Sequence, residues 1–206
     1  MEEKKKIYQK WWFILLIIIV YTIIIVLITA SVMNKTSIKT GANEIEDLIT
    51  EGNHKIEKQK PKVVTLNDKI EEKDWEVTIK ETGFKQDIVP SNPDSYYTHY
   101  QVKDTNNTYF YLVVEAKNIS SLELRADKIA KVKVKYNDKY EYTTFSTIEE
   151  SGGGTFTYTN ITDIAPLTSR KVYYLVELPQ TIAQETNTQI KAEININNNL
   201  YELIIR

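Results

Sequence analysis

WEVTIK, residues 75–80, is the stretch of sequence that decides the fold. Its three apolar side chains alternate with three polar ones: Trp75, Val77 and Ile79 against Glu76, Thr78 and Lys80. Successive side chains of a β-strand point to opposite faces. This period of two therefore predicts a strand with one buried face and one face in water.

The same period recurs from Val63 onward. Further alternating stretches lie at residues 109–118, 131–136, 140–146, 155–159, 172–178, 190–196 and 200–206. Asn137-Asp138 and the asparagines at 197–199 have the composition of turns, which predicts that the chain reverses there. About seven to nine short strands separated by turns predict an all-β fold, an immunoglobulin-like antiparallel β-sandwich over residues 63–206.

A different pattern, without any charge, occupies residues 11–33, which read WWFILLIIIVYTIIIVLITASVM. A helix of about 20 apolar residues is roughly as long as the hydrocarbon core of a bilayer is thick, so the sequence predicts one transmembrane helix. Four lysines precede this segment, and only Lys35 and Lys39 follow it closely. The positive-inside rule therefore predicts a cytoplasmic stub at residues 1–10 and an extracytoplasmic C-terminal domain.

The apolar segment has an alternative interpretation as a cleaved signal peptide. Ile28-Thr29-Ala30 is a poor version of the small-x-small cleavage site, and the apolar region is well above the usual ~7 to 15 residues. We therefore expect an uncleaved signal anchor and a single-pass membrane protein. Both interpretations place the domain outside the cytoplasm.

Residues 34–62 are polar and nearly free of aromatic side chains, which predicts an extracytoplasmic stalk between anchor and domain. Asn43 and Glu46 resemble a capping box, and Ile45, Leu48 and Ile49 have helical spacing, so we expect a short helix there. As flexible coil, a stalk of this length has an end-to-end distance of about 30 Å. It would hold the domain near the membrane.

Composition excludes several classes of function. The chain of 206 residues has a formal net charge of −2, of which the first ten residues contribute +2, so the remainder is mildly acidic. Nucleic-acid binding needs clustered Lys and Arg and is not expected. The sequence contains no cysteine, which excludes disulfides, thiolate nucleophiles and a lipid-modified cysteine, and in an exported domain favours a bacterial surface.

Three segments together resemble a known family: VVTLNDKIEEKDWEVTIKETGF (63–84), YFYLVVEAKNISS (109–121) and ITDIAPLTSRKVYYLVELP (161–179). It is a bacterial family of uncharacterised, immunoglobulin-like extracytoplasmic domains found on Gram-positive lipoproteins and membrane-anchored proteins. Its fold is similar to that of a secreted mycobacterial immunoprotective antigen. The resemblance covers about residues 63–206 and implies fold and location, but no catalytic residues. Many members carry a lipid-modified cysteine, from which this chain departs.

The sequence predicts no metal or cofactor site. His54 and His99 are the only histidines, and they form neither an HExxH motif nor a paired-histidine zinc site. Residues 104–108, DTNNT, carry oxygen ligands at close spacing but lack the glycine and the bidentate glutamate of a calcium loop. We expect an ordinary turn there.

No catalytic constellation is evident, so an enzyme is not expected. Gly152–Gly154 lack the Lys-Ser or Lys-Thr of a phosphate loop, and a mobile loop is the plain interpretation. Glu149 and Glu150, just before it, resemble ordinary paired surface acids. A glycosidase needs two carboxylates about 5 to 9.5 Å apart across a cleft, which sequence cannot show.

Five tyrosines form the candidate binding patch: Tyr96, Tyr97, Tyr100, Tyr109 and Tyr111. A tyrosine combines a flat apolar ring with a hydroxyl group, which suits contact with a protein surface or a sugar. If several of these rings are exposed on one side, they form a binding patch. The alternative is that they cover the edge of the sandwich and pack the loop between them.

We expect a membrane-anchored extracytoplasmic binding module that contacts another surface protein, through loops at one end of the sandwich or an open edge strand. A second hypothesis is recognition of cell-wall polysaccharide by the same tyrosines. A third, an extracytoplasmic hydrolase, requires a closed cleft with convergent polar groups and perturbed carboxylates.

Overall fold

The computed structural model describes Thr22 and residues 60–206. The predicted cytoplasmic stub, transmembrane helix and nearly all of the stalk therefore lie outside the described residues. Within the described part, no helix has the length and apolar character that a membrane span requires. The chain divides into two compact units, Met1–Glu57 and Lys58–Arg206, and the second is described below.

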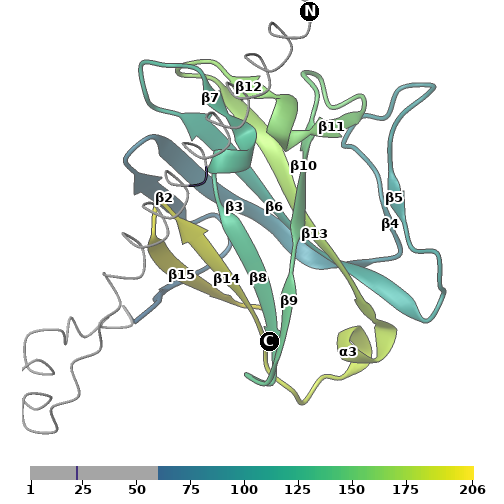
Figure 1. Cartoon of the computed structure of the whole chain (residues 1–206). Helices are drawn as coiled ribbons and strands as arrows, with labels where there is room; N and C mark the ends of the chain where they lie inside the picture. The colour runs from purple at the N-terminus through teal and green to yellow at the C-terminus, as the bar shows by residue number, and fades with distance from the viewer. Residues whose placement is uncertain (1–21, 23–59) are drawn as a thin grey trace, which may run out of the picture. The chain divides into compact units, whose positions relative to one another are not determined.

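The second unit is a β-sandwich of two large sheets (Figure 1). The order of strands in the five-stranded sheet is β1 (Lys62–Val64), β15 (Asn199–Ile204), β14 (Ile190–Ile196), β8 (Lys131–Tyr136) and β9 (Tyr140–Thr143). The order in the six-stranded sheet is β11 (Phe156–Tyr158), β10 (Phe145–Glu149), β13 (Ser169–Pro179), β6 (Asn107–Asn118), β3 (Trp75–Lys85) and β2 (Lys69–Glu72). All pairs in these sheets are antiparallel except β1 with β15, which is parallel.

Two short strand pairs and three short helical segments complete the unit. The pairs are β4 (Asp87–Ile88) with β5 (Tyr100–Gln101), and β7 (Leu124–Arg125) with β12 (Asp163–Ile164). The helical segments are two 3-10 turns, η1 (Ala126–Lys128) and η2 (Thr159–Ile161), and α3 (Gln180–Gln184).

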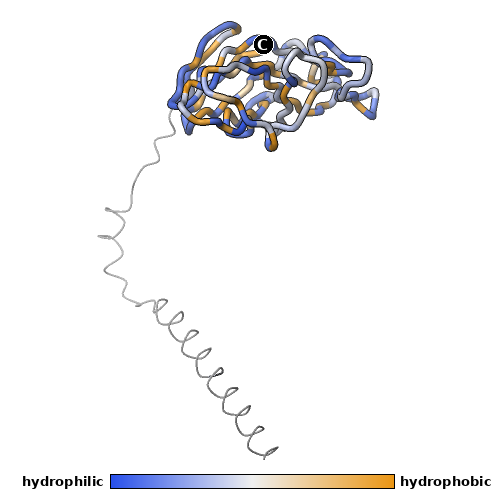
Figure 2. The backbone as a smooth tube through the Cα atoms, turned by 90° about the horizontal axis from the view of Figure 1, so that it is seen from above, coloured by the Kyte–Doolittle hydropathy of each residue, from blue (hydrophilic) through white to orange (hydrophobic). Residues whose placement is uncertain are grey.

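The main core lies between the two large sheets. Trp75, Val77 and Ile79 of β3 are buried in it, as the alternation in WEVTIK predicts. The five-stranded sheet contributes apolar side chains from β8, β14 and β15: Val132, Val134, Ile190, Ala192, Ile194, Ile196, Tyr201 and Leu203. Figure 2 shows hydrophobic and hydrophilic residues following one another along the strands. The all-β prediction is therefore confirmed in its coarse form, a β-sandwich.

The predicted hairpin turns are present. Asn137 and Asp138 have φ of 53° and 49°, and Asn197 and Asn198 have φ of 50° and 68°. Two successive residues with positive φ are typical of the tight turn that matches the twist of a two-stranded hairpin. The first joins β8 to β9, and the second joins β14 to β15.

Residues 140–146 do not form the single returning strand that the alternation predicts. Tyr140–Thr143 pairs with β8 as β9, whereas Phe145–Glu149 pairs with β13 as β10 in the other sheet. Thr144 lies at the crossing, where its backbone N–H (3.2 Å) and its hydroxyl (2.9 Å) both donate to the carbonyl oxygen of Val132. These bonds fix the point at which the chain changes sheet.

Candidate functional site

Residues 86–106, which we call the covering arm, connect β3 to β6 and fold over the outer face of the six-stranded sheet (Figure 1). β4 and β5 pair within the arm, and the N–H of Val102 donates to the carbonyl of Gln86 (3.0 Å). The arm covers a second apolar cluster, to which β4 of the arm and β6, β11 and β13 of the sheet contribute: Ile88, Tyr111, Val113, Phe156, Tyr173 and Leu175. The middle of the six-stranded sheet is therefore buried on both faces.

The middle of the covering arm docks on the loop that contains the three glycines. The N–H groups of Asn92 and Asp94 donate to the carbonyls of Gly153 (2.9 Å) and Gly154 (3.0 Å). A Cβ on Gly154 would lie 2.2 Å from the carboxylate of Asp94. Instead of the mobile loop expected from the sequence, the glycine loop is a docking edge whose missing side chains allow the arm to approach.

The glycine loop offers a matched pair of substitutions. At Gly152 (φ +93°) a Cβ meets nothing within 4 Å, whereas at Gly153 (φ +74°) it would lie 2.7 Å from Oγ of Ser91. Both alanines carry the backbone strain of a positive φ, about 1 kcal/mol. We expect Gly153→Ala to lower the free energy of unfolding of residues 58–206 by about 1 kcal/mol more than Gly152→Ala, because it also displaces the arm. Equal losses in urea denaturation would contradict the docking contact.

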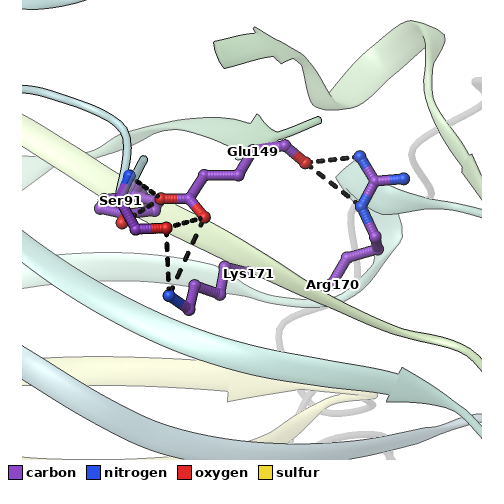
Figure 3. A network of polar contacts seen from close by, with 5 residues as sticks. Ser91, Glu149, Arg170 and Lys171 are labelled. Atoms are coloured by element: carbon purple, nitrogen blue, oxygen red, sulfur yellow. Dashed lines mark hydrogen bonds and ion pairs between the residues drawn. The ribbon is translucent and has the colours of Figure 1, made fainter. Parts of the chain in front are cut away.

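The side chain of Glu149 is a further attachment point of the arm (Figure 3). Its side chain is only 5% exposed, and it ends β10 on the outer face of the sheet. Its carboxylate accepts hydrogen bonds from the N–H and the hydroxyl of Ser91 (2.7 Å each) and from the hydroxyl of Tyr173 (2.6 Å). Lys171 Nζ lies 3.9 Å from the same carboxylate. A buried carboxylate is stable only when its oxygens are satisfied in this way.

Arg170 binds the backbone of Glu149 and not its side chain. It donates to the backbone oxygen of Glu149 through Nε (3.2 Å) and Nη2 (2.5 Å), as Figure 3 shows. Glu149 is buried, so the prediction of two ordinary surface acids is wrong for this residue, whereas Glu150 is exposed. The signal was present in the alternation of β10, since Phe145, Thr147 and Glu149 share one face.

A second carboxylate–tyrosine pair lies on the same outer face. The hydroxyl of Tyr111 donates to Glu81 (2.6 Å), and Lys85 Nζ lies 3.5 Å from that carboxylate and 4.8 Å from the centre of the Tyr111 ring. The register of β3 against β6 shifts between Ile79 and Glu81. Such a bulge redirects side chains, and it brings Lys80 and Glu81 to the same groove.

The groove between the arm and the sheet has a volume of about 390 Å³ and is lined by Lys80, Glu81, Lys85, Tyr111, Lys171 and Tyr173, among others. Burial, followed by the hydrogen bonds to Glu149 and Glu81, raises the pKa of the Tyr173 and Tyr111 hydroxyls well above their ordinary value. The hydrogen bond from Tyr111, opposed by partial burial and aided by Lys85, lowers the pKa of Glu81. Near neutral pH these groups are fixed as phenols and a carboxylate. The Tyr173–Glu149 pair adjoins Ser91 of the arm, whereas the Tyr111–Glu81 pair joins β6 to β3.

The lowered pKa of Glu81 predicts an acid-dependent loss of stability. A carboxylate whose pKa is lower in the folded protein than the unfolded value of 4.5 contributes stability above that value. This contribution is lost as the pH falls through the folded pKa. We therefore expect the difference in unfolding free energy between the native sequence and Glu81→Gln to be constant near pH 7 and to shrink below pH 4.5. Urea denaturation at several pH values measures it, and a pH-independent difference would contradict it.

The five tyrosines of the candidate patch do not form one exposed surface, so that prediction needs correction. Tyr111 is buried, and Tyr100 and Tyr109 are partly buried. The Tyr100 ring lies 5.2 Å from Phe145, and its hydroxyl donates to Thr147 (3.1 Å). Tyr109 and Tyr111 belong to β6, and Tyr100 reaches the sheet from β5 of the arm. The three rings pack between the arm and the sheet, as the alternative interpretation proposed.

The other two tyrosines are exposed in the segment of the arm that connects β4 to β5. Tyr96 is 94% exposed and Tyr97 is 41% exposed. The Tyr97 ring packs edge-on against His99 at 5.8 Å, and His99 Nδ1 lies 2.9 Å from a carboxylate oxygen of Asp87. We call Tyr96, Tyr97 and His99 the arm tip. Tyr96 and Tyr97 are the two members of the candidate patch that are exposed.

The remaining sequence candidates can be placed as follows. Within residues 60–206, no group of three or more His, Asp or Glu side chains is arranged to hold a metal ion. Asp104 forms a turn, because its side chain accepts a hydrogen bond from the N–H of Asn106 (2.8 Å) and its carbonyl one from Asn107 (2.9 Å). His54 lies outside the described residues.

Comparison with known proteins supports the fold. No family model and no curated protein matches the chain. Among solved structures it is similar to an uncharacterised β-sandwich protein from Clostridium difficile 630, with 27% identity and a TM-score of 0.67 over 73% of this chain and 97% of that one. The fold is shared. A conserved hypothetical protein from Bacillus anthracis aligns at 12% identity and a TM-score of 0.48, over 69% of this chain and 94% of that one.

Proposed function

We propose that the chain is a single-pass membrane protein that presents an immunoglobulin-like binding module outside the cell and contacts another surface protein through the arm tip. The anchor rests on the apolar segment at residues 11–33 and the lysines before it. The proposed family is the one that the sequence resembles, the uncharacterised extracytoplasmic immunoglobulin-like domains.

Strand order supports the immunoglobulin-like assignment. Immunoglobulin sandwiches have strands A-B-E-D in one sheet and C, F and G in the other. Here β3-β6-β13-β10 and β15-β14-β8-β9 are neighbours in the two sheets. Taken in chain order, they correspond to A-B-E-D and G-F-C-C′. The covering arm is then an elaboration of the connection between strands A and B.

The observation that carries the binding proposal is that two exposed tyrosines stand on an arm held at several points. Tyr96 and Tyr97 follow Ser91, which is bound to Glu149, and precede Thr98, whose N–H donates to Thr155 Oγ1 (2.9 Å). An exposed tyrosine offers a large contact area at a small loss of conformational entropy. A surface that is ordered before binding loses little further freedom on contact.

The test uses the full chain in its own membrane, with a photo-crosslinking amino acid at Ser95, next to the arm tip. We expect the double variant Y96A/Y97A to reduce the yield of crosslinked partner about tenfold or more, since tyrosines at the centre of an interface each contribute over about 1 kcal/mol. The matched control is Tyr140→Ala, because Tyr140 is also exposed but belongs to β9 of the other sheet. Equal yields from Y96A/Y97A and the control would remove the arm tip from the proposal.

Recognition of cell-wall polysaccharide by the same tyrosines is the second candidate function. Aromatic rings on an exposed tip also suit the flat faces of sugars. Sedimentation with wall material that has been stripped of protein separates the two: a polysaccharide ligand survives the stripping, and a protein partner does not. For a hydrolase the groove gives no support, because a general acid needs a raised carboxyl pKa, whereas that of Glu81 is lowered.

A further inference from the structure

Leu167 has a conformation and an exposure that folding alone does not favour. It is 73% exposed and has a φ of +61°. It follows Pro166 in a turn closed by the hydrogen bond from Thr168 N–H to the Ala165 carbonyl (3.2 Å). The third position of such a turn normally holds Gly or Asn, because other side chains are strained there. A leucine at this position gains nothing from the core, since its side chain points into solvent.

The buried Asn118 also binds the loop of a second exposed leucine, Leu122. Asn118, with no exposed surface, donates to the carbonyls of Leu122 (2.7 Å) and Ile164 (2.8 Å). Its backbone carbonyl accepts a hydrogen bond from the N–H of Leu167 (2.8 Å). Leu122 is 69% exposed. One buried residue, through its side chain and its backbone carbonyl, thus binds both loops that carry the exposed leucines.

Ile161 completes an apolar surface at this end of the sandwich. It is 71% exposed and lies in η2, directly before β12, which pairs with β7. The N–H of Ala126 donates to the carbonyl of Thr162 (2.9 Å), so η2 lies against the start of η1. We call Leu122, Ile161 and Leu167 the apolar end. β7 and β12 lie together beyond the ends of the long strands in Figure 1.

The polypeptide enters the sandwich at the same end. β1 starts at Lys62, which pairs with Tyr201 near the start of β15. β15 starts at the turn after β14, and the residues of that turn line a pocket together with Asp127 and Lys128 of η1. Residues 34–59 separate the predicted anchor from the first described residue of the sandwich. The chain therefore enters the sandwich at the end that carries Leu122, Ile161 and Leu167.

We propose that the apolar end docks into the interfacial region of the membrane in which the chain is anchored. The inference rests on the proposed membrane anchor. A bilayer is the occupant that the tether supplies at a high effective concentration, so a small apolar contact suffices for docking. The described residues 60–206 are acidic overall, so attraction to anionic headgroups would not drive the docking, and the apolar side chains would have to supply it.

The test exploits the absence of cysteine from the sequence. Leu122→Cys, Leu167→Cys and Gln184→Cys are introduced singly into the full chain, labelled with a polarity-sensitive fluorophore and reconstituted into phosphatidylcholine–phosphatidylglycerol vesicles. Gln184 is the control, because α3 follows the end of β13 that is opposite to Asn118. Docking predicts blue-shifted emission and quenching by nitroxide lipids at positions 122 and 167, but not at position 184.

Equal quenching at the three positions would overturn the proposal. A fluorescence change that depends on protein concentration and is insensitive to nitroxide lipid would assign the apolar end to a second copy of the chain and also overturn it. Alkaline extraction tests the anchor separately: release of the chain from the vesicles contradicts the proposed function, whereas retention without quenching contradicts only the docking.

A second set of variants keeps the fold. Leu167→Asn suits a positive φ, and with Leu122→Ser it removes two of the three apolar side chains. With the fluorophore at Ile161→Cys, we expect the ratio of docked to free sandwich to fall about tenfold or more. Unfolding of the Leu167→Asn variant in urea is expected to require at least as much denaturant as the native sequence. Unchanged docking in the double variant would contradict the proposal.

Discussion

Glu149→Ala is expected to lower the free energy of unfolding of the sandwich by about 3 kcal/mol, because the buried Tyr173 loses the acceptor of its hydroxyl and the covering arm loses both hydrogen bonds of Ser91 to β10. The two donors of Ser91 and the hydroxyl of Tyr173 lose their acceptor at once. Since Ser91 belongs to the covering arm, the arm is also released from β10. The second cluster beneath it then becomes exposed to water.

Urea denaturation of residues 58–206 measures this effect. These residues form a compact unit with a hydrophobic core of its own. The neighbouring Glu150→Ala is the matched control, because Glu150 is exposed and its loss should change stability by less than about 0.5 kcal/mol. Similar losses from both substitutions would contradict the attachment of the arm by Glu149.

Asn118→Ala, at the C-terminal end of β6, is expected to have a comparable effect, about 3 kcal/mol. The side-chain amide donates to the carbonyls of Leu122 and Ile164, and its oxygen accepts hydrogen bonds from the N–H (2.9 Å) and the hydroxyl (2.7 Å) of Ser120. Alanine leaves these groups unpaired, and at least one of the contacts is fully buried.

Two further variants sharpen this prediction. Asn118→Asp keeps the acceptor but loses both donations and buries a charge, so it should be at least as destabilising as alanine. Asn187→Ala, at an exposed asparagine between α3 and β14, should be neutral. If Asn118→Ala unfolds at the same urea concentration as Asn187→Ala, Asn118 does not hold the two loops together.

The period of two located most strands because each main strand has a fixed core-facing side. WEVTIK in β3, the alternating residues of β14 and the turns at Asn137-Asp138 and Asn197-Asn198 are local features, and local sequence suffices to specify them. The fold class follows from their number and spacing. The crossing at Thr144 was missed because residues 140–146 keep a single period while changing sheet.

The candidate site was less predictable because it depends on contacts between distant residues. Tyr109 and Tyr111 lie on the outer face of β6, which a sandwich normally leaves in water. Only the covering arm, joined to Glu149 across 58 residues of sequence, makes that face a second core. The tyrosines therefore divide between packing and exposure in a way that their spacing does not reveal.

β1 determines how the sandwich responds to a pull on the tether. Only three residues, Lys62 to Val64, pair with β15, and the strands are parallel. A force applied at Lys62 would reach this short ladder before the pairing of any later strand. Its rupture would lengthen the tether by only about 3.3 Å per released residue, while the antiparallel pairing of β14 with β15 stays intact. Under a stretching force β1 would therefore detach first, while the other strands of the domain stay paired.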